Sequence, residues 1–429
     1  MSTSPKVAVP AAADSPGESD YAHLRERDSV LADLVIAEEE RQRGSLLMMA
    51  GENYAFPAVR DVMGSLLINK YAEGYPERRH HSGCEIVDKI EELAIQRATA
   101  LFGAEYANVQ PYSGTSAVLA AYAAILHPGD SVLAMALEHG GHFTQGLPDN
   151  LSGHLFDFHW YQVRRDTHLI DYDQVRDMAR KTRPKAIVCG GNYYPRHIDY
   201  QAFRQIADEV GAYLLVDAAP VTGLVAGGAA PNPVPYADIV CAVTYKTLRG
   251  PRGGLILSHS HLSHRLDAAV YPFAQGGPHM HSIAAKAAAL GEAATPQFAT
   301  YAHQTVANAR TLAHALTEHG LLLSTGGTDT HQVITDVTPL GLTGPQARTR
   351  CTRAGIIIDS CPLPYDAQPA DKPSGIRMGT AALTAQGMTE KDILHIAQLM
   401  TRTLHDTNDV HTTETATAVS TLITQHPPR

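Results

Sequence analysis

Short apolar runs alternate with helical segments over about residues 86–256, and this alternation limits the possible folds more than any other feature. The strand-like run Ala186–Cys189, for example, precedes Tyr200–Val210, where apolar residues recur at helical spacing. Such alternation is typical of βαβ units and predicts an α/β fold with a mostly parallel sheet. Ala212–Val216 is apolar throughout, as expected of a strand buried on both faces, and Asp217 follows it. Because such sheets bind ligands at the carboxyl ends of their strands, Asp217 is a candidate site residue.

The length of 429 residues predicts more than one domain. We expect a tail and an arm helix in residues 1–45, a large domain in 46–300, a small C-terminal α/β domain in 301–412 and a flexible tail in 413–429. The arm helix is expected over Asp28–Arg43, where apolar residues recur at helical spacing among many charged ones. A long Ala-rich helical stretch from about Ser282 to His319 would lead out of the large domain.

The composition argues for a small-molecule substrate. A net charge of −10 without a basic stripe argues against nucleic acid or an anionic membrane surface as partner. No stretch reaches the roughly 18 apolar residues of a membrane span, and residues 1–20 do not resemble a signal peptide. The five scattered cysteines lack the spacing of a zinc site or a disulfide framework, so we expect no metal and a cytoplasmic location.

Three features suggest cofactor chemistry. Lys246 lies among small, turn-forming residues after the strand-like run Ile239–Val243, and a desolvated lysine amine can form an imine with a carbonyl cofactor. Asp217 could pair with a protonated pyridine nitrogen. The segment Gln110–Ala117 is a turn rich in Gly and hydroxyl residues that leads into a helix, and its amides would suit a phosphate.

Each feature also has a plainer explanation. Lys246 could be a surface lysine, Asp217 a turn residue, and Gln110–Ala117 an ordinary helix cap. Together, however, a lysine, an acid and a phosphate cradle in one α/β chain are what pyridoxal phosphate (PLP) chemistry requires. The spacing alone does not identify the cofactor.

Five segments closely resemble serine hydroxymethyltransferase, and the likeness extends from about Arg43 to Met400. The segments are Asn69–Pro76, Gly103–Gln110, His139–His142, Thr247–Gly254 and Gln275–Pro278. The resemblance implies the PLP-dependent, aspartate-aminotransferase-like fold, with a large cofactor-binding domain and a smaller C-terminal one. It also implies PLP as the cofactor and an α-amino acid as the substrate.

Matching positions imply roles in holding the cofactor. Lys246 would carry PLP as a Schiff base, Asp217 would pair with the pyridine nitrogen, and His142 would stack on the ring. The remaining cofactor contacts implied are Ser113, Gly114 and Thr115 at the phosphate, and Gly276 and Gly277 at the phosphate of the neighbouring subunit. The last pair implies a homodimer with shared active sites, or a tetramer of such dimers. Asn192 stands where the family usually has a serine near the phenolic oxygen of PLP, and Tyr245 stands where it has a histidine, so both are further candidate contacts near the ring.

The resemblance also implies a substrate site. Arg377 matches the arginine that grips the substrate α-carboxylate, a role suited to a bidentate guanidinium. Glu73 matches the acid/base carboxylate, and Tyr71 lies beside it in the motif. Outside their motifs, His142 could be a packing histidine, Glu73 a solvated carboxylate and Arg377 a surface ion pair.

The sequence departs from the family pattern around the substrate side chain and the folate. Gly51 replaces a serine that helps hold the carboxylate, and His80 and His81 replace two tyrosines near the one-carbon position. Pro220 and Tyr245 each replace a histidine near the cofactor. The segment Asp359-Ser360-Cys361 stands in place of a folate-side Asn-Lys-Asn.

These departures predict a repurposed, folate-independent relative that cleaves or exchanges a bond at Cα or Cβ of an amino acid, in specialised metabolism. Lys246, Glu73 or His81 would move the protons. Aldol or transaldol exchange on a threonine-like acid is the most direct reaction, and β-elimination of a cysteine conjugate or decarboxylation needs the same electron sink. Ordinary folate-dependent hydroxymethyl transfer and a non-catalytic PLP-binding protein remain as alternatives.

Overall fold

A seven-stranded sheet forms the centre of the large domain in the computed structural model, which describes residues 21–406 and 411–428. In spatial order the strands are β4 (Tyr106–Asn108), β10 (Gly254–Ser258), β9 (Ile239–Val243), β8 (Tyr213–Asp217), β7 (Ala186–Gly190), β5 (Ser131–Met135) and β6 (Asp157–Tyr161). The strands from β9 to β6 are parallel, while β10 runs antiparallel to both β9 and β4. The predicted mostly parallel sheet is confirmed.

Successive residues of the inner strands enter opposite cores. In β8, Leu214 and Val216 pack into one apolar cluster, while Leu215 packs into a second. The first cluster includes residues of α4 (Glu85–Phe102), α7 (Tyr172–Thr182), α8 (Tyr200–Val210) and α11 (Met280–Ala293), and the second those of α5 (Gly114–Ile125) and α10 (Ser263–Ala268). Burial of both faces explains why these strands read as continuous apolar runs.

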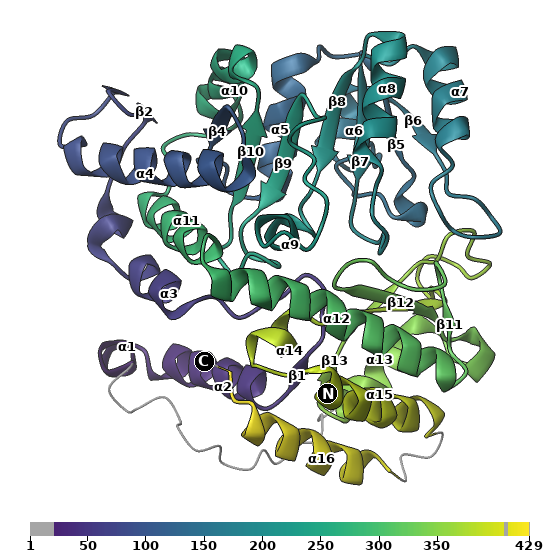
Figure 1. The fold of residues 1–429 in the computed structure, drawn as a ribbon. Helices are drawn as coiled ribbons and strands as arrows, with labels where there is room; N and C mark the ends of the chain where they lie inside the picture. Colours follow the sequence, from purple (N-terminus) through teal and green to yellow (C-terminus); the bar gives the residue numbers. More distant parts are fainter. Residues whose placement is uncertain (1–20, 407–410, 429) are drawn as a thin grey trace.

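A four-stranded antiparallel sheet organises the small domain, beneath the large one in Figure 1. Its strands in spatial order are β11 (Leu322–Leu323), β12 (Gln332–Asp336), β15 (Gly375–Gly379) and β14 (Asp359–Cys361), and it packs with α13 (Gly344–Arg353) and α15 (Glu390–His405). The expected boundary at residue 46 is wrong in detail. Strand β1 (Leu46–Leu47) pairs with β13 (Ile356–Ile357), and Leu46 and Met48 are buried in the small-domain core.

The Ala-rich stretch expected from Ser282 to His319 is two helices. Helix α11 ends at Ala293, and α12 (Pro296–Glu318) crosses from the large domain to the small one (Figure 1). Proline lacks an N–H, so it cannot continue a helix but is tolerated in the first turn. The Thr295 side chain caps the new helix by accepting from the Phe298 N–H.

Two terminal segments are helical. The expected arm helix is α2 (Ser29–Arg43), capped by the Asp28 side chain. The flexible tail expected over residues 413–429 is wrong, because Thr412–Gln425 forms helix α16. Val419, Leu422 and Ile423 lie at helical spacing and are buried against the small-domain core. Threonine and serine dominate the segment, so these few apolar residues gave no clear signal in the sequence.

The packing of α16 leads to a stability prediction. Replacing Leu422 with alanine should lower the free energy of unfolding by about 2–3 kcal/mol, because it leaves a cavity in the small-domain core. Chemical unfolding of the protein measures this loss. The neighbouring Thr421→Ala change, at an exposed position of the same helix, should have an effect below about 0.5 kcal/mol. Equal effects of the two substitutions would show that α16 does not pack as described.

The cysteines and the hydropathy of the helices add two observations. All five cysteines are buried free thiols. Among the described residues, no helix is both long and apolar enough to cross a membrane.

Candidate active site

Lys246 lies in the loop after β9, near the carboxyl ends of the parallel strands. Its Nζ donates a hydrogen bond to Asn192 Oδ1 at 3.3 Å, and the side chain is only partly exposed. Burial lowers the pKa of Lys246 to about 8, against the opposing effect of the Asp217 carboxylate, and the nearby Arg377 lowers it further. Lys246 is therefore not a freely solvated surface lysine.

Asp217 and His142 lie in the electrostatic neighbourhood of Lys246. Asp217 ends β8, is 7% exposed, and accepts a hydrogen bond from the Ala219 N–H at 3.1 Å. His142 Nδ1 is 2.8 Å from the Thr144 hydroxyl. Burial lowers the pKa of His142, and the Lys246 charge adds to this effect while Asp217 opposes it. The neutral form that this favours suits a ring that stacks on another aromatic ring.

Arg377 comes from β15 of the small domain and reaches the same place. Its Nη1 donates to the backbone oxygen of Asn192 at 2.9 Å and to Asn192 Oδ1 at 3.2 Å. Its guanidinium lies 4.5 Å from the centre of the Tyr193 ring. Its Nη2 pairs with Asp359 on the neighbouring strand β14. We call Lys246, Asn192, Asp217, His142 and Arg377 the Lys246 group.

The N-terminus of α5 provides a candidate anion site. Ser113 is the N-cap, and it forms a reciprocal capping box with Ser116. Since these bonds occupy the Ser113 hydroxyl and amide, the free donors are the amides of Gly114 and Thr115, which have no acceptor within the helix. Gly114 is required, because a Cβ there would lie 2.6 Å from a Val243 methyl. The cap interpretation is confirmed, and it leaves room for an anion.

Lys286 in α11 contacts the segment that leads into this turn. The sequence did not identify it as a candidate residue. Its side chain is 1% exposed, and its Nζ donates to the backbone oxygens of Val109, Pro111 and Gly254 at 2.6, 3.0 and 2.9 Å. Burial lowers the pKa of Lys286 to about 7, whereas three carbonyl acceptors favour the charged form. Lys286 thus ties the segment before the α5 turn to the start of β10. Its one signal in the sequence was a lone cation in an alanine-rich helix.

Tyr71, Glu73 and His81 form a second cluster, which we call the Glu73 group. The Tyr71 hydroxyl donates to Glu73 Oε1 at 3.1 Å, and His81 Nε2 lies 3.1 Å from Glu73 Oε2. The Tyr71 and His81 rings meet edge to face, with centroids 4.6 Å apart. Gly277 lies against Glu73 and Tyr71, since a Cβ added there would be 3.3 Å from Glu73 Cγ, and Gly276 lies near Glu73 Oε1.

The Glu73 group is on a different part of the molecule from Lys246. It flanks the hairpin of β2 (Gly74–Tyr75) and β3 (Arg78–Arg79), which projects beyond α4, away from β7 and β8 (Figure 1). His80 lies on the same hairpin, with its ring 5.8 Å from that of Tyr271. Within residues 21–406 and 411–428, the hydrogen bonds of the Glu73 side chain go only to Tyr71 and His81. One chain therefore holds two separate groups of predicted site residues.

The replaced positions near Lys246 have distinct surroundings. A Cβ at Gly51 would meet nothing within 4 Å, so crowding does not explain the absence of a serine there. The backbone oxygen of the preceding Ala50 bonds to Nε2 of the buried His331, another residue that the sequence did not suggest. The Tyr245 ring lies 4.1 Å beneath the Arg252 guanidinium.

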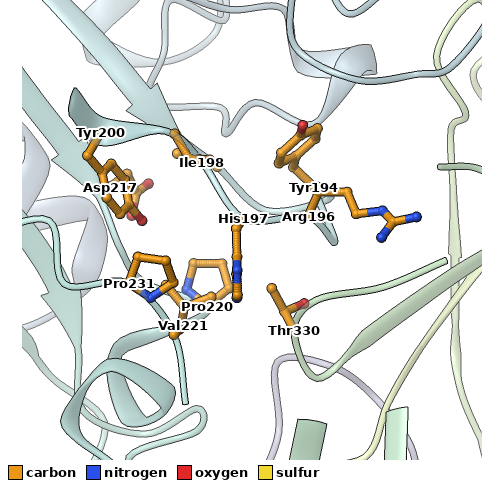
Figure 2. A pocket seen from close by; sticks show the side chains of 13 residues that line it. Tyr194, Arg196, His197, Ile198, Tyr200, Asp217, Pro220, Val221, Pro231 and Thr330 are labelled. Atoms are coloured by element: carbon orange, nitrogen blue, oxygen red, sulfur yellow. The ribbon is translucent and has the colours of Figure 1, made fainter. Parts of the chain in front are cut away.

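Pro220 lines a small cavity beside Asp217. The cavity holds about 30 Å³ and is bounded by both domains (Figure 2). The His197 ring lies between Asp217 on one side and Thr330, which precedes β12, on the other (Figure 2). The proline ring contributes no polar atom to this space, so position 220 offers no substitute for the family histidine.

The residues of the Lys246 group fit PLP. A lysine with a lowered pKa can form an imine, a buried carboxylate can pair with a pyridinium nitrogen, and the free amides of Gly114 and Thr115 can donate hydrogen bonds to a phosphate. Asp217 carries no ion pair with a cationic side chain among the described residues, which leaves its carboxylate available for such a pairing.

The lowered pKa of Lys246 leads to a pH prediction. Only the neutral amine adds to a carbonyl, and the neutral fraction grows as the pH rises through the pKa. The rate at which the apoprotein takes up PLP should therefore rise with a midpoint near pH 8 and not near the ordinary lysine value of 10.5. Stopped-flow absorbance across this range measures the midpoint. Asp217→Asn should move it lower, since Asp217 raises this pKa, and a midpoint near 10.5 would contradict the assigned environment.

A comparison with known families agrees with this geometry. The family model for serine hydroxymethyltransferase matches residues 24–400. The match includes the Lys246 group, the Glu73 group and the α5 turn. Enzymes of this family use PLP, have the type I PLP fold and act on amino acids. The chain therefore belongs to the serine hydroxymethyltransferase family and is a PLP-dependent enzyme of amino-acid metabolism.

Proposed function

We propose that the protein cleaves or exchanges the Cα–Cβ bond of a β-hydroxy amino acid without folate. The observation that carries this proposal is the position of Glu73 between a phenol and an imidazole. An imidazole has two ring nitrogens, so it can accept a proton at one while it donates a proton from the other, whereas a phenol has a single oxygen. His81, in place of a tyrosine, thus gives the acid/base carboxylate a partner that can pass a proton on through its second ring nitrogen.

The Lys246 group would hold the cofactor and the substrate. Lys246 anchors PLP, Asp217 pairs with its ring nitrogen, and His142 covers the ring. When bound, PLP supplies an electron sink for the charge that develops at Cα. Arg377 binds the substrate α-carboxylate, because a guanidinium matches a carboxylate with two parallel hydrogen bonds.

The Glu73 group would move the proton of the substrate hydroxyl. Glu73 Oε2 accepts this proton as the Cα–Cβ bond breaks, and the hydrogen bond to His81 Nε2 offers it a way to the next carrier. In the reverse direction the same pair protonates the oxygen of an incoming aldehyde. Cleavage followed by addition of a different aldehyde is a transaldol exchange, which consumes no one-carbon carrier.

The proposal includes a homodimer with shared active sites. The Glu73 group and Gly276–Gly277 contact one another and lie apart from Lys246 within one chain. We propose that a second copy brings its Glu73 group and this glycine pair to the Lys246 group of the first. Enzymes of the family are oligomeric, which supports this arrangement.

Folate independence rests on what surrounds the reacting atoms. Pro220, Tyr245 and Asp359 stand where the resemblance implies two histidines and an asparagine on the cofactor and folate side. Asp359 contributes a carboxylate that is engaged with Arg377, and Pro220 contributes an apolar ring. Pro220 thus removes a polar group, and Asp359 replaces an amide with a carboxylate that Arg377 already engages, while the predicted PLP contacts Lys246, Asp217 and His142 are retained.

The test is product analysis with purified holoenzyme. Serine, threonine, allo-threonine and an S-substituted cysteine are each incubated with and without tetrahydrofolate, and glycine, aldehydes, pyruvate and carbon dioxide are measured. We expect glycine and an aldehyde from a β-hydroxy acid at the same rate with and without folate. Folate-dependent formation of glycine from serine would overturn the proposal. Formation of pyruvate from the cysteine derivative would identify β-elimination instead, and release of carbon dioxide would identify decarboxylation. No turnover of any of these compounds would indicate a PLP-binding protein without catalytic activity.

A further inference from the structure

Asp359 forms an ion pair with Arg377, the residue that the proposed function assigns to the substrate carboxylate. Strands β14 and β15 are antiparallel, and their register places Asp359 directly opposite Arg377. Side chains at directly opposite positions lie on the same face of a sheet within contact distance. The Asp359 carboxylate pairs with Arg377 Nη2, and the two side chains are 19% and 7% exposed. The strand register itself thus builds this ion pair.

Arg377 has contacts other than Asp359 that hold it in position. Both acceptors of Asn192 hold its Nη1, and the Tyr193 ring supports the guanidinium plane. Arg377 Nε is a buried donor for which the described residues provide no acceptor. The donors left over for a ligand are therefore Nε and Nη2, and Asp359 already uses the second.

We propose that Asp359 competes with the substrate α-carboxylate for Arg377 and so limits the affinity of the site for amino acids. This inference rests on the proposed role of Arg377. An incoming carboxylate has to share Nη2 with Asp359 or displace it, and in both cases two negative charges come close together in a partly buried place. The site therefore binds every amino acid more weakly than the guanidinium alone would allow, and releases a small product such as glycine readily.

The competing explanation is that Asp359 orients Arg377 for its ligand. The two explanations predict opposite effects when the charge of Asp359 is removed. Asparagine has nearly the same shape and can still accept a hydrogen bond from Nη2, but it carries no negative charge to repel a carboxylate. An orienting role predicts weaker binding by the Asn variant, and a competing role predicts tighter binding.

The experiment is a spectral titration of holoenzyme with matched pairs of amines. Glycine and L-alanine carry the α-carboxylate, while methylamine and ethylamine are the same molecules without it. Each titration gives an equilibrium dissociation constant from the change in cofactor absorbance, for the wild type, Asp359→Asn and Asp359→Ser. Asp336→Asn is the control, since Asp336 lies in the same sheet but binds Thr338 and not Arg377.

We expect Asp359→Asn to lower the dissociation constants of glycine and L-alanine by roughly tenfold or more. The dissociation constants of methylamine and ethylamine should not change. Asp359→Ser should act in the same direction, and Asp336→Asn should leave all four constants unchanged. Weaker or unchanged binding of glycine in both Asp359 variants would overturn the proposal, and so would equal tightening of the simple amines. None of these ligands has a hydroxyl on Cβ, so the aldol cleavage of the proposed function plays no part in the titration, and failure of one proposal can be told from failure of the other.

Discussion

Replacing Lys246 with alanine should lower kcat/KM by at least about 10³-fold, because the residue supplies both the covalent anchor and a proton carrier. The variant should also lose the visible absorbance that PLP acquires when it is bound through an imine. Its fold should persist, since the Lys246 side chain is partly exposed and hydrogen-bonds only to Asn192 among the residues described, while the backbone oxygen that accepts from Asn53 and Arg249 is kept. Steady-state kinetics with a substrate identified by the product analysis gives the first effect, and an absorbance spectrum gives the second.

Lys181→Ala is a matched control for this prediction. Lys181 lies on an exposed face of α7 in the same domain. Its replacement should leave kinetics and spectrum unchanged. If the Lys246 variant kept both its turnover and the absorbance of the bound cofactor, another lysine would have to be the anchor.

Replacing Lys286 with methionine should lower the free energy of unfolding by about 3 kcal/mol, because the carbonyl oxygens of Val109, Pro111 and Gly254 lose the hydrogen bonds from Nζ, and only that of Pro111 has a further donor shown, the Gly254 N–H. The same change should weaken PLP binding, since Val109 and Pro111 lead directly into the phosphate turn at Ser113. Chemical unfolding gives the first quantity, and titration of the apoprotein with PLP gives the second.

Two controls separate the effects of Lys286 on the turn from general destabilisation. Lys391→Met, at an exposed position of α15, should change neither quantity. Leu422→Ala should destabilise the small-domain core without weakening PLP binding, because it is remote from the phosphate turn. If Lys286→Met bound PLP as tightly as the wild type, Lys286 would be a structural cation with no part in positioning the turn.

Local patterns predicted the elements of the large domain well. Strand β9 and helix α8 have the predicted bounds, because both faces of the sheet are buried and an amphipathic helix is readily recognised. The misses depend on tertiary contacts. Two-residue strand β1 is defined only by its pairing with β13, and α16 by three apolar residues that contact the small-domain core. The break before α12 was readable from Pro296.

The candidate site shows the same division. Lys246, Asp217 and the α5 turn follow directly from strand and helix ends, so they could be predicted from the sequence. Asp359 and Lys286 could not be assigned these contacts, because each meets its partners only through the fold. Asp359 reaches Arg377 through an antiparallel register, and Lys286 reaches three carbonyls from a helix 32 or more residues away in sequence.

The most direct test of the central claim is the exchange of the glycine Cα hydrogen with deuterated solvent, followed by NMR on the holoenzyme. The Lys246 group should labilise this hydrogen without help from a folate, because Lys246, Asp217 and Arg377 match the family residues that hold PLP and the carboxylate. We predict the same exchange rate with and without tetrahydrofolate, and loss of exchange in Lys246→Ala. An exchange rate that rises severalfold when tetrahydrofolate is added would contradict the account and identify an ordinary folate-dependent hydroxymethyltransferase.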